Sequence, residues 1–297
     1  MNEQTPSRYE TENGQRFYTI EELRGRPLVS VTTITGIIDK PGLVGWSARM
    51  AVEFIQSEIL DQLEQRKITI ADLRKADVKN LVQDAKDYHK QLKEEAGDRG
   101  TRVHKFIEEF VAATLVGESE DPFGSGLPVV EAGRDIADQV ERFIKWWLEN
   151  DVVPIFQEKT VWSVDGGGYA GTLDAYWRVN GSHYIIDIKT SKGLWPEHEM
   201  QLAGYYHAFV ERFPKMPVDA VAFLHISELT GFAEFLPRTL DFINGEYRKF
   251  FFLAHYVNTC EEIKAAAQAE AKLKKTVKNL YGDKPARKAP ATSWGDL

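Results

Sequence analysis

Two carboxylates and a lysine in one short stretch of the sequence have the types and spacing of a phosphodiester-hydrolysing site. Asp174 precedes an Asn180-Gly181 turn, and Asp187 and Lys189 follow it. Two residues apart on one strand, Asp187 and Lys189 leave the same face, and pairing across the turn would bring Asp174 beside Asp187. Adjacent carboxylates repel, and Mg²⁺ or Mn²⁺ is the usual remedy. The predicted chemistry is metal-assisted hydrolysis, with the lysine orienting or deprotonating the attacking water.

Side chains on two helical stretches are candidates for the same site. His104 is a plausible third metal ligand, and an imidazole favours Mn²⁺ somewhat more than an all-oxygen set would. Gln201 and Tyr205, four residues apart, present an amide and a phenol on one helix face. Each feature has an ordinary alternative: a surface ion pair between Asp187 and Lys189 on an edge strand, a hydrogen-bonded histidine at an interface, and a helix-surface contact. It is their combination that favours a catalytic interpretation.

The elements that must position these residues follow from hydrophobic periodicity. β-Branched or alternating segments predict strands over 28–34, 154–162, 169–179, 184–189, 218–227 and about 231–236. Helical spacing predicts helices over 43–63, 77–93, 100–111, 135–149, 197–209 and 240–271. Gly-rich and Pro-rich stretches predict a turn at 166–168 and a loop at 117–128. This order describes a mixed β-sheet flanked by helices, an α/β or α+β core.

Composition limits the classes of protein that the chain can belong to. The 297 residues carry a formal net charge of −8, which counts against a uniformly basic nucleic-acid binder but allows a local basic groove. Cys260 is the only cysteine, so an internal disulfide and a four-cysteine zinc or iron–sulfur site are excluded. A reducing cytoplasm is the expected compartment. No apolar run is long enough to cross a bilayer, so no membrane association is expected.

Three segments are expected along the chain. Residues 1–27 are polar and are predicted to be a flexible N-terminal segment. Residues 28–271 are predicted to form one domain, with 43–97 as an N-terminal helical insertion, and residues 272–297 to form a basic, mobile tail.

Taken in order, His104, Asp174, Asp187-x-Lys189 and Gln201-x-x-x-Tyr205 resemble the motifs of the PD-(D/E)XK nuclease superfamily. The similarity covers about 30–227 and looks strongest to the RecB-like exonuclease branch, which includes phage-type nucleases and mitochondrial genome maintenance exonucleases. Gly100 and His104 match the G-x-x-x-H helix of that branch. The resemblance implies a restriction-endonuclease-like core without an iron–sulfur cluster. It also implies one or two Mg²⁺ or Mn²⁺ ions, with four ligands: His104, Asp174, Asp187 and Ile188.

The resemblance further implies a DNA substrate, single-stranded or with a free end, and an exonuclease of replication, recombination or repair, in the host cytosol if phage-encoded. Glu158 is expected to orient Lys189 or metal-bound waters. Trp195 and Tyr205 are candidates for stacking on bases, although Trp195 beside Pro196 equally suits a loop anchor. The expected DNA contacts are Arg99, Thr101, Arg102, Lys105, Thr190 and Lys192.

Other possibilities stay open at this point. The stretch 43–97 is interpreted as a helical arch through which a strand threads. The tail adds phosphate affinity or solubility, and its end at 293–297 is a candidate docking peptide for a recombinase or a single-strand-binding protein. An endonuclease of the same superfamily and a non-cleaving DNA-binding accessory protein are the alternative functions, although the presence of all four catalytic residue types disfavours a dead site.

Overall fold

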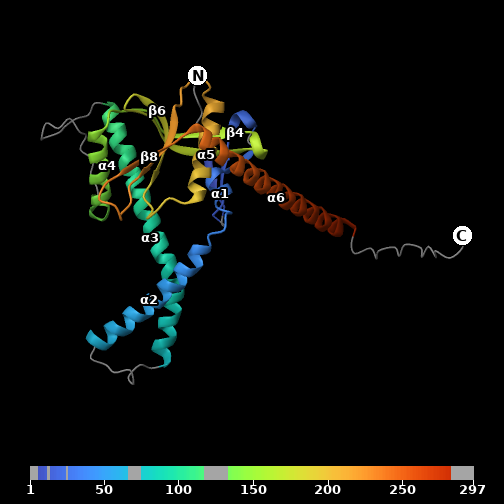
Figure 1. The fold of residues 1–297 in the computed structure, drawn as a ribbon. Coiled ribbons are helices and arrows are strands. Elements are labelled where there is room, and N and C mark those ends of the chain that lie inside the picture. The colour runs from blue at the N-terminus through green and yellow to red at the C-terminus, as the bar shows by residue number, and fades with distance from the viewer. Residues whose placement is uncertain (1–5, 12–13, 25, 66–74, 117–132, 282–297) are drawn as a thin grey trace, which may run out of the picture.

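A mixed β-sheet forms the centre of the molecule (Figure 1). The computed structural model describes residues 6–11, 14–24, 26–65, 75–116 and 133–281. Within these residues the sheet has eight strands in the order β1-β2-β3-β5-β6-β7-β8, and β4 pairs with β5 beside that path. The strands are β1 (Ser7–Glu10), β2 (Arg16–Thr19), β3 (Pro27–Ser30), β4 (Val152–Ser163), β5 (Tyr169–Val179), β6 (Ser182–Lys189), β7 (Ala220–His225) and β8 (Glu234–Arg238).

The sheet is mixed because β3 runs parallel to β5 and β6 runs parallel to β7, while the remaining pairs are antiparallel. The hairpin between β5 and β6 turns at Asn180 and Gly181, which have φ values of 50° and 87°. Such a two-residue turn with positive φ at both positions matches the twist of the flanking strands. The predicted hairpin and its turn are therefore confirmed.

Helices cover both faces of this sheet (Figure 1). Buried residues of α3 and α4 pack on one face, and those of α1, α5 and α6 pack on the other. This confirms the predicted sheet flanked by helices. The helices are α1 (Val31–Thr35), α2 (Pro41–Gln65), α3 (Lys75–Val116), α4 (Ala137–Glu149), α5 (Pro196–Arg212) and α6 (Leu240–Tyr281), with 3₁₀ turns η1 (Glu21–Leu23), η3 (Arg134–Ile136) and η4 (Asp165–Gly167).

Side chains of strand β6 alternate between the two hydrophobic cores, one on each face of the sheet. Ile186 and Ile188 lie in the core beneath α3 and α4, whereas Ile185 lies in the core beneath α5 and α6. Asp187 and Lys189 share the face of Ile185 because side chains on a strand alternate. The polar pair therefore points toward α5, as expected from a strand whose other face is apolar.

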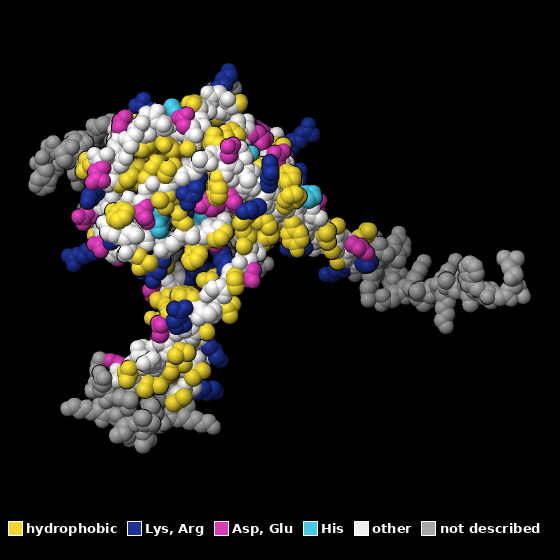
Figure 2. All heavy atoms as spheres, viewed as in Figure 1, with side chains coloured by type: hydrophobic (Ala, Val, Ile, Leu, Met, Phe, Trp, Pro, Cys, Tyr) yellow, Lys and Arg dark blue, Asp and Glu magenta, His cyan; other side chains and the backbone are white. Residues whose placement is uncertain are grey.

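Helix α2 and the first half of α3 form a hairpin that projects from the body, and α6 extends away from it in another direction (Figure 1). We call the hairpin, residues 41–65 with 75–99, the arm. Apolar side chains lie on the surface of the arm (Figure 2); Val44 is 72% exposed and Val52 is 62% exposed.

Two predicted boundaries near the site were wrong. The strand expected over 28–34 ends at Ser30, and α1 follows, because the Ser30 side chain accepts a hydrogen bond from the Thr33 amide and caps a helix. The helices expected over 77–93 and from Gly100 are one continuous helix, α3. Glycine inside a helix costs only about 1 kcal/mol relative to alanine, so Gly97 and Gly100 did not interrupt it.

The two ends of the chain also differ from expectation. The segment 1–27, predicted to be loose, contains β1 and β2, which pair with each other and with β3. Helix α6 runs ten residues past the predicted end at 271, to Tyr281. The predicted loop at 117–128 and the docking peptide at 293–297 lie outside the described residues. Among the described helices, none is long and apolar enough to span a membrane.

Candidate active site

Asp174 occupies the point at which β5 and β6 separate. Their backbone pairing runs from Val179 opposite Ser182 to Ala175 opposite Ile186. Beyond it the Ile188 amide donates to Asp174 Oδ2 at 2.7 Å, so the carboxylate replaces a backbone acceptor. Leu173 and Ala175 lie in opposite cores although they are two residues apart. The break in alternation at Asp174 directs its carboxylate along the sheet toward β6.

Asp187 is held in a polar network beneath α5. Its side chain is 2% exposed, and its Oδ2 lies 2.6 Å from Lys189 Nζ. Gln201 on α5 joins both residues: its Oε1 accepts from Lys189 Nζ at 3.2 Å, and its Nε2 lies 3.5 Å from Asp187 Oδ1. The same Nε2 donates to the Tyr205 hydroxyl at 3.1 Å. The four residues that the sequence placed on two separate elements therefore form one hydrogen-bonded cluster.

The charge of Asp187 is costly in this position. Burial and the like charge of Asp174 together raise the pKa of Asp187 to about 6, because burial outweighs the opposing effect of the Lys189 ammonium. Burial also raises the pKa of Tyr205 well above its usual value, as do the charges of Asp187 and Asp174. Tyr205 thus keeps its proton throughout the physiological range.

His104 reaches the cluster from α3. Its Nδ1 is 3.7 Å from Asp174 Oδ1, and its side chain is 30% exposed. The glycine one turn earlier explains how α3 comes so close: a Cβ added at Gly100 would lie 2.8 Å from Thr190 Oγ1. The spacing of Gly100 and His104 therefore has a steric reason, because a Cβ at position 100 would have to displace the Thr190 hydroxyl.

Glu158 lies on β4 opposite Asp174, between Gln157 and Lys159, which pair with Ala175 and Leu173. Its φ of 48° is unusual for a residue with a side chain and marks an irregularity in β4 next to the site. Partial burial of the carboxylate, with the like charges of Asp174 and Glu108, raises the pKa of Glu158 to about 8, although the residue keeps contact with solvent. The sequence did not indicate this backbone conformation.

Three side chains could hold a metal ion together. One donor atom each from His104, Glu158 and Asp174 lies within 4.8 Å of the others. Among the described residues, Asp187 is outside this group, because it is turned toward Lys189. Ile188 contributes its amide to Asp174, and its side chain is in the core. The group therefore differs from the predicted ligands: it takes in Glu158, which was predicted only to orient Lys189 or waters.

Most of the predicted DNA contacts are paired with other residues of the chain. Arg99 and Lys192 both lie 3.6 Å from Glu228. Arg102 pairs with Asp135, and Lys105 lies 3.6 Å from Glu109. The Thr101 hydroxyl is turned back to the Gly97 carbonyl. These side chains already have partners within the chain, so none of them singles out a path for DNA.

The two predicted stacking residues differ sharply. Trp195 is 54% exposed, and its amide donates to His198 Nδ1 at the start of α5. Tyr205 is 4% exposed, and its ring lies against Gly171 so closely that a Cβ there would overlap it. The prediction that Tyr205 stacks on a base was wrong, because its ring is enclosed by the protein.

Sequence reasoning missed several residues that support the cluster. Buried His225 on β7, paired with Lys189 of β6, lies 2.7 Å from the Ser191 carbonyl and 3.2 Å from Glu234. His198 faces Lys189; burial and that positive charge lower its pKa to about 3. At the start of α5, Glu197 forms a 2.6 Å ion pair with Lys40. No local motif marks these residues, since their roles depend on contacts across elements.

Comparisons with known proteins identify no family for this chain. No protein-family profile matches the sequence, and no curated protein is significantly similar to it. One solved structure that it partly resembles is described as the crystal structure of SSO0001. The match has 20% sequence identity, covers 52% of this chain and 70% of the other, and has a TM-score of 0.25. A similarity of this size supports no argument about fold or function.

Proposed function

We propose that the chain is a Mg²⁺- or Mn²⁺-dependent deoxyribonuclease with a PD-(D/E)XK core, acting as an exonuclease on single-stranded or free-ended DNA. The observation that carries the proposal is the position of Asp174, whose carboxylate lies between the Ile188 amide and His104 while Asp187 and Lys189 extend from the neighbouring strand. Two acids, a lysine and a histidine thus meet where two strands part.

The donor set suits a divalent cation. His104, Glu158 and Asp174 offer one imidazole nitrogen and two carboxylates within a radius that one ion spans, and the carboxylate of Asp187 lies outside that group, paired with Lys189 on the neighbouring strand. Oxygen-rich ligation suits Mg²⁺, and the imidazole adds a preference for Mn²⁺. When bound, such an ion supplies positive charge at the scissile phosphate and lowers the pKa of a coordinated water.

The chain's own residues then have separate tasks. The Lys189 side chain is 15% exposed and lies at the edge of the cluster. Its ammonium is available there to orient the attacking water and to offset charge on the phosphate. Gln201 fixes that ammonium through its Oε1, and Tyr205 fixes the Gln201 amide. Both are positioning residues in this proposal, because they reach the phosphate through Lys189 rather than directly.

The test is cleavage of linear single-stranded and double-stranded DNA with Mg²⁺ or Mn²⁺. We expect wild-type protein to degrade linear strands and to leave circular single strands intact. Lys189→Ala and Asp187→Ala should lower the rate at least ~100-fold, and Lys215→Ala, an exposed lysine remote from the cluster, should not change it. Equal rates for all four proteins would refute the proposal, and cleavage of circles would favour an endonuclease.

A second measurement separates a lost ion from a lost lysine. Calorimetric titration with Mn²⁺ should show binding to wild type and to Lys189→Ala, but weak or no binding to Asp174→Ala. If wild type binds DNA and no metal, the alternative of a non-cleaving DNA-binding protein gains support.

A further inference from the structure

One face of α3 carries four lysines in line with His104. Lys86 precedes His104 by 18 residues, which is five turns of an α-helix, so both side chains leave the helix in the same direction. Lys79 and Lys93 lie within about 20° of that direction, and Lys90 lies within about 40°. We call these four residues the lysine face.

The lysine face contains no acid. Between Lys79 and His104, the other residues of α3 within about 40° of that direction are Val82, Gly97 and Gly100. Lys86 hydrogen-bonds to Gln83, and Lys90 pairs with Asp87 at its border. With the residues that the structure describes, neither Lys79 nor Lys93 forms an ion pair. A protein of net charge −8 thus keeps a line of positive charge that leads to the proposed metal ligand.

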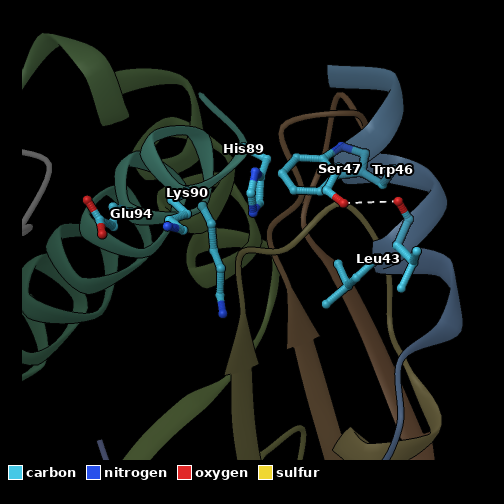
Figure 3. Close-up of a pocket in the computed structure, with 8 residues that line it drawn as sticks. Leu43, Trp46, Ser47, His89, Lys90 and Glu94 are labelled. Atoms are coloured by element: carbon cyan, nitrogen blue, oxygen red, sulfur yellow. Dashed lines mark hydrogen bonds between the residues drawn. The ribbon is translucent and has the colours of Figure 1, made fainter. Parts of the chain in front are cut away.

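A pocket of about 520 Å³ opens beside this line, between the two helices of the arm (Figure 3). Trp46 of α2 and His89 of α3 meet in it edge to face, with ring centroids 6.5 Å apart. Leu43 and Val44 add apolar surface, and the lysine face borders it. The pocket is lined by Leu43, Val44, Trp46, Ser47, His89, Lys90, Lys93 and Glu94.

We infer that a single strand of DNA runs along the lysine face toward His104 and that one of its bases stacks on Trp46 in this pocket. The inference rests on the proposed function and names the path of its substrate. Phosphates on the lysines and bases on aromatic rings are the two contacts by which proteins hold single strands without regard to sequence. A duplex does not fit this description, since its bases are stacked inside and do not reach a pocket.

The length of the lysine face sets the number of nucleotides that it can hold. Lys79 and His104 are 25 residues apart, which is about 38 Å along a helix. A stacked strand advances about 3.4 Å per nucleotide, so about 11 nucleotides span the path. Affinity should therefore rise with strand length up to about a dozen nucleotides and then level off.

The experiment is fluorescence anisotropy with labelled oligothymidylates of 4 to 30 nucleotides, in EDTA so that no strand is cleaved. The triple variant Lys79→Gln, Lys86→Gln, Lys93→Gln should bind a 20-nucleotide strand about tenfold more weakly than wild type, with a salt dependence shallower by about 2 in the log–log slope. It should bind a 4-nucleotide strand nearly as wild type does.

A matched control changes the net charge equally at other places. Lys145→Gln, Lys215→Gln, Lys264→Gln removes three exposed lysines from α4, the segment after α5, and α6, and it should bind as wild type does. For the pocket, Trp46→Ala should lose about tenfold in affinity, the effect of one stacked base, while Trp46→Phe should retain most of it. Thermal melting checks that each variant is folded.

The outcomes separate this inference from the proposed function. If both triple variants lose affinity equally, or neither does, the lysine face is not the path, whether or not the wild type cleaves DNA. If the wild type does not cleave but the first triple variant alone loses affinity, the nuclease proposal fails and the path stands. If Trp46→Ala instead converts a dimer to a monomer in sedimentation and leaves affinity unchanged, the pocket is a contact between two copies and the inference is overturned.

Discussion

The amide of Ile188 donates to Asp174 Oδ2 at 2.7 Å, so a side chain of β5 serves as the acceptor that the backbone of β5 no longer offers to β6. This bond gives Asp174 a structural role beside its proposed catalytic one. The two roles depend on different properties of the side chain: the hydrogen bond needs an acceptor oxygen, and the ion needs a negative charge.

Substitutions at Asp174 should therefore separate stability from metal binding. Asp174→Asn keeps an acceptor oxygen and should change the free energy of unfolding by less than about 1 kcal/mol, whereas Asp174→Ala leaves the buried Ile188 amide without its partner and should cost about 1–3 kcal/mol. Both should lose Mn²⁺ binding. Urea unfolding without metal and calorimetric Mn²⁺ titration measure the two effects. Equal stability of the two variants would show that the hydrogen bond contributes nothing.

Two glycines of α3 offer a matched pair for testing the approach of His104 to the sheet. A Cβ at Gly100 would lie 2.8 Å from Thr190 Oγ1, and a Cβ at Gly97 would meet nothing within 4 Å. Gly97→Ala should stabilise the chain by about 0.5–1 kcal/mol, as alanine does in an open helix. Gly100→Ala should instead destabilise it by about 1–3 kcal/mol through overpacking.

The rescue of Gly100→Ala tests the same contact directly. Thr190→Ala removes the hydroxyl that the new methyl group would strike, so the double variant Gly100→Ala, Thr190→Ala should recover most of the stability. Thermal unfolding in a double-mutant cycle measures this coupling. If Gly100→Ala were as stable as Gly97→Ala, the steric explanation of the G-x-x-x-H spacing would be wrong.

The outcomes for particular residues show what the sequence could reveal. The β5–β6 hairpin was predictable, because alternation and the Asn180-Gly181 turn are local signals. The same alternation places Asp187 and Lys189 on one face of β6, the face that α5 covers. The continuity of α3 was not predictable from local rules, since Gly100 reads as a helix boundary until its neighbour Thr190 is known.

The composition of the candidate metal group could not be predicted from the sequence either. Glu158 joins His104 and Asp174 because β4 adopts a positive φ opposite the break in β5. Backbone irregularities of this kind arise from pairing between strands, and no residue type in 152–163 signals one. The clustering of His104 with Asp174 and of Gln201 with Lys189 agrees with the arrangement expected from the motifs. The ion and the reaction stay predictions.

His198 should make the folded state sensitive to acid. Burial and Lys189 lower its pKa to about 3, below the value of about 6.5 for an unfolded chain. The fold therefore favours neutral His198, and its contribution to stability is complete above pH 6.5 and is lost as the pH falls toward 3. His198→Gln does not titrate and keeps an acceptor oxygen for the Trp195 amide.

The comparison to make is urea unfolding of wild type and His198→Gln between pH 7.5 and pH 4.5. Below pH 6.5, the unfolding free energy of wild type should decrease relative to that of His198→Gln by up to about 1.4 kcal/mol for each pH unit. A difference that stays constant over this range would mean that His198 remains protonatable in the fold.

Lys189 and Asp187 form an ion pair whose carboxylate is buried. Replacing Lys189 by methionine keeps the apolar stem and leaves the Asp187 carboxylate, 2% exposed, without its counter-charge. Breaking a buried pair in this way costs about 3–5 kcal/mol, and we expect a loss of that order at pH 7.5. The double variant Asp187→Asn, Lys189→Met removes both charges and should recover most of the loss, although it should be as inactive as Lys189→Met.

The pH dependence of Lys189→Met follows from the same burial. In wild type the pKa of Asp187 is already raised to about 6, above its usual 3.8, by burial, and loss of the ammonium should raise it further. A carboxyl group with a raised pKa in the fold binds a proton that the unfolded chain does not, so stability increases as the pH falls from above 6 to 3.8. Lys189→Met should therefore be less destabilised relative to the double variant at pH 5 than at pH 7.5. Urea unfolding at the two pH values measures this difference. Equal destabilisation at both would mean that Asp187 stays charged without Lys189. Solvent or another group, rather than the lysine, would then compensate its charge.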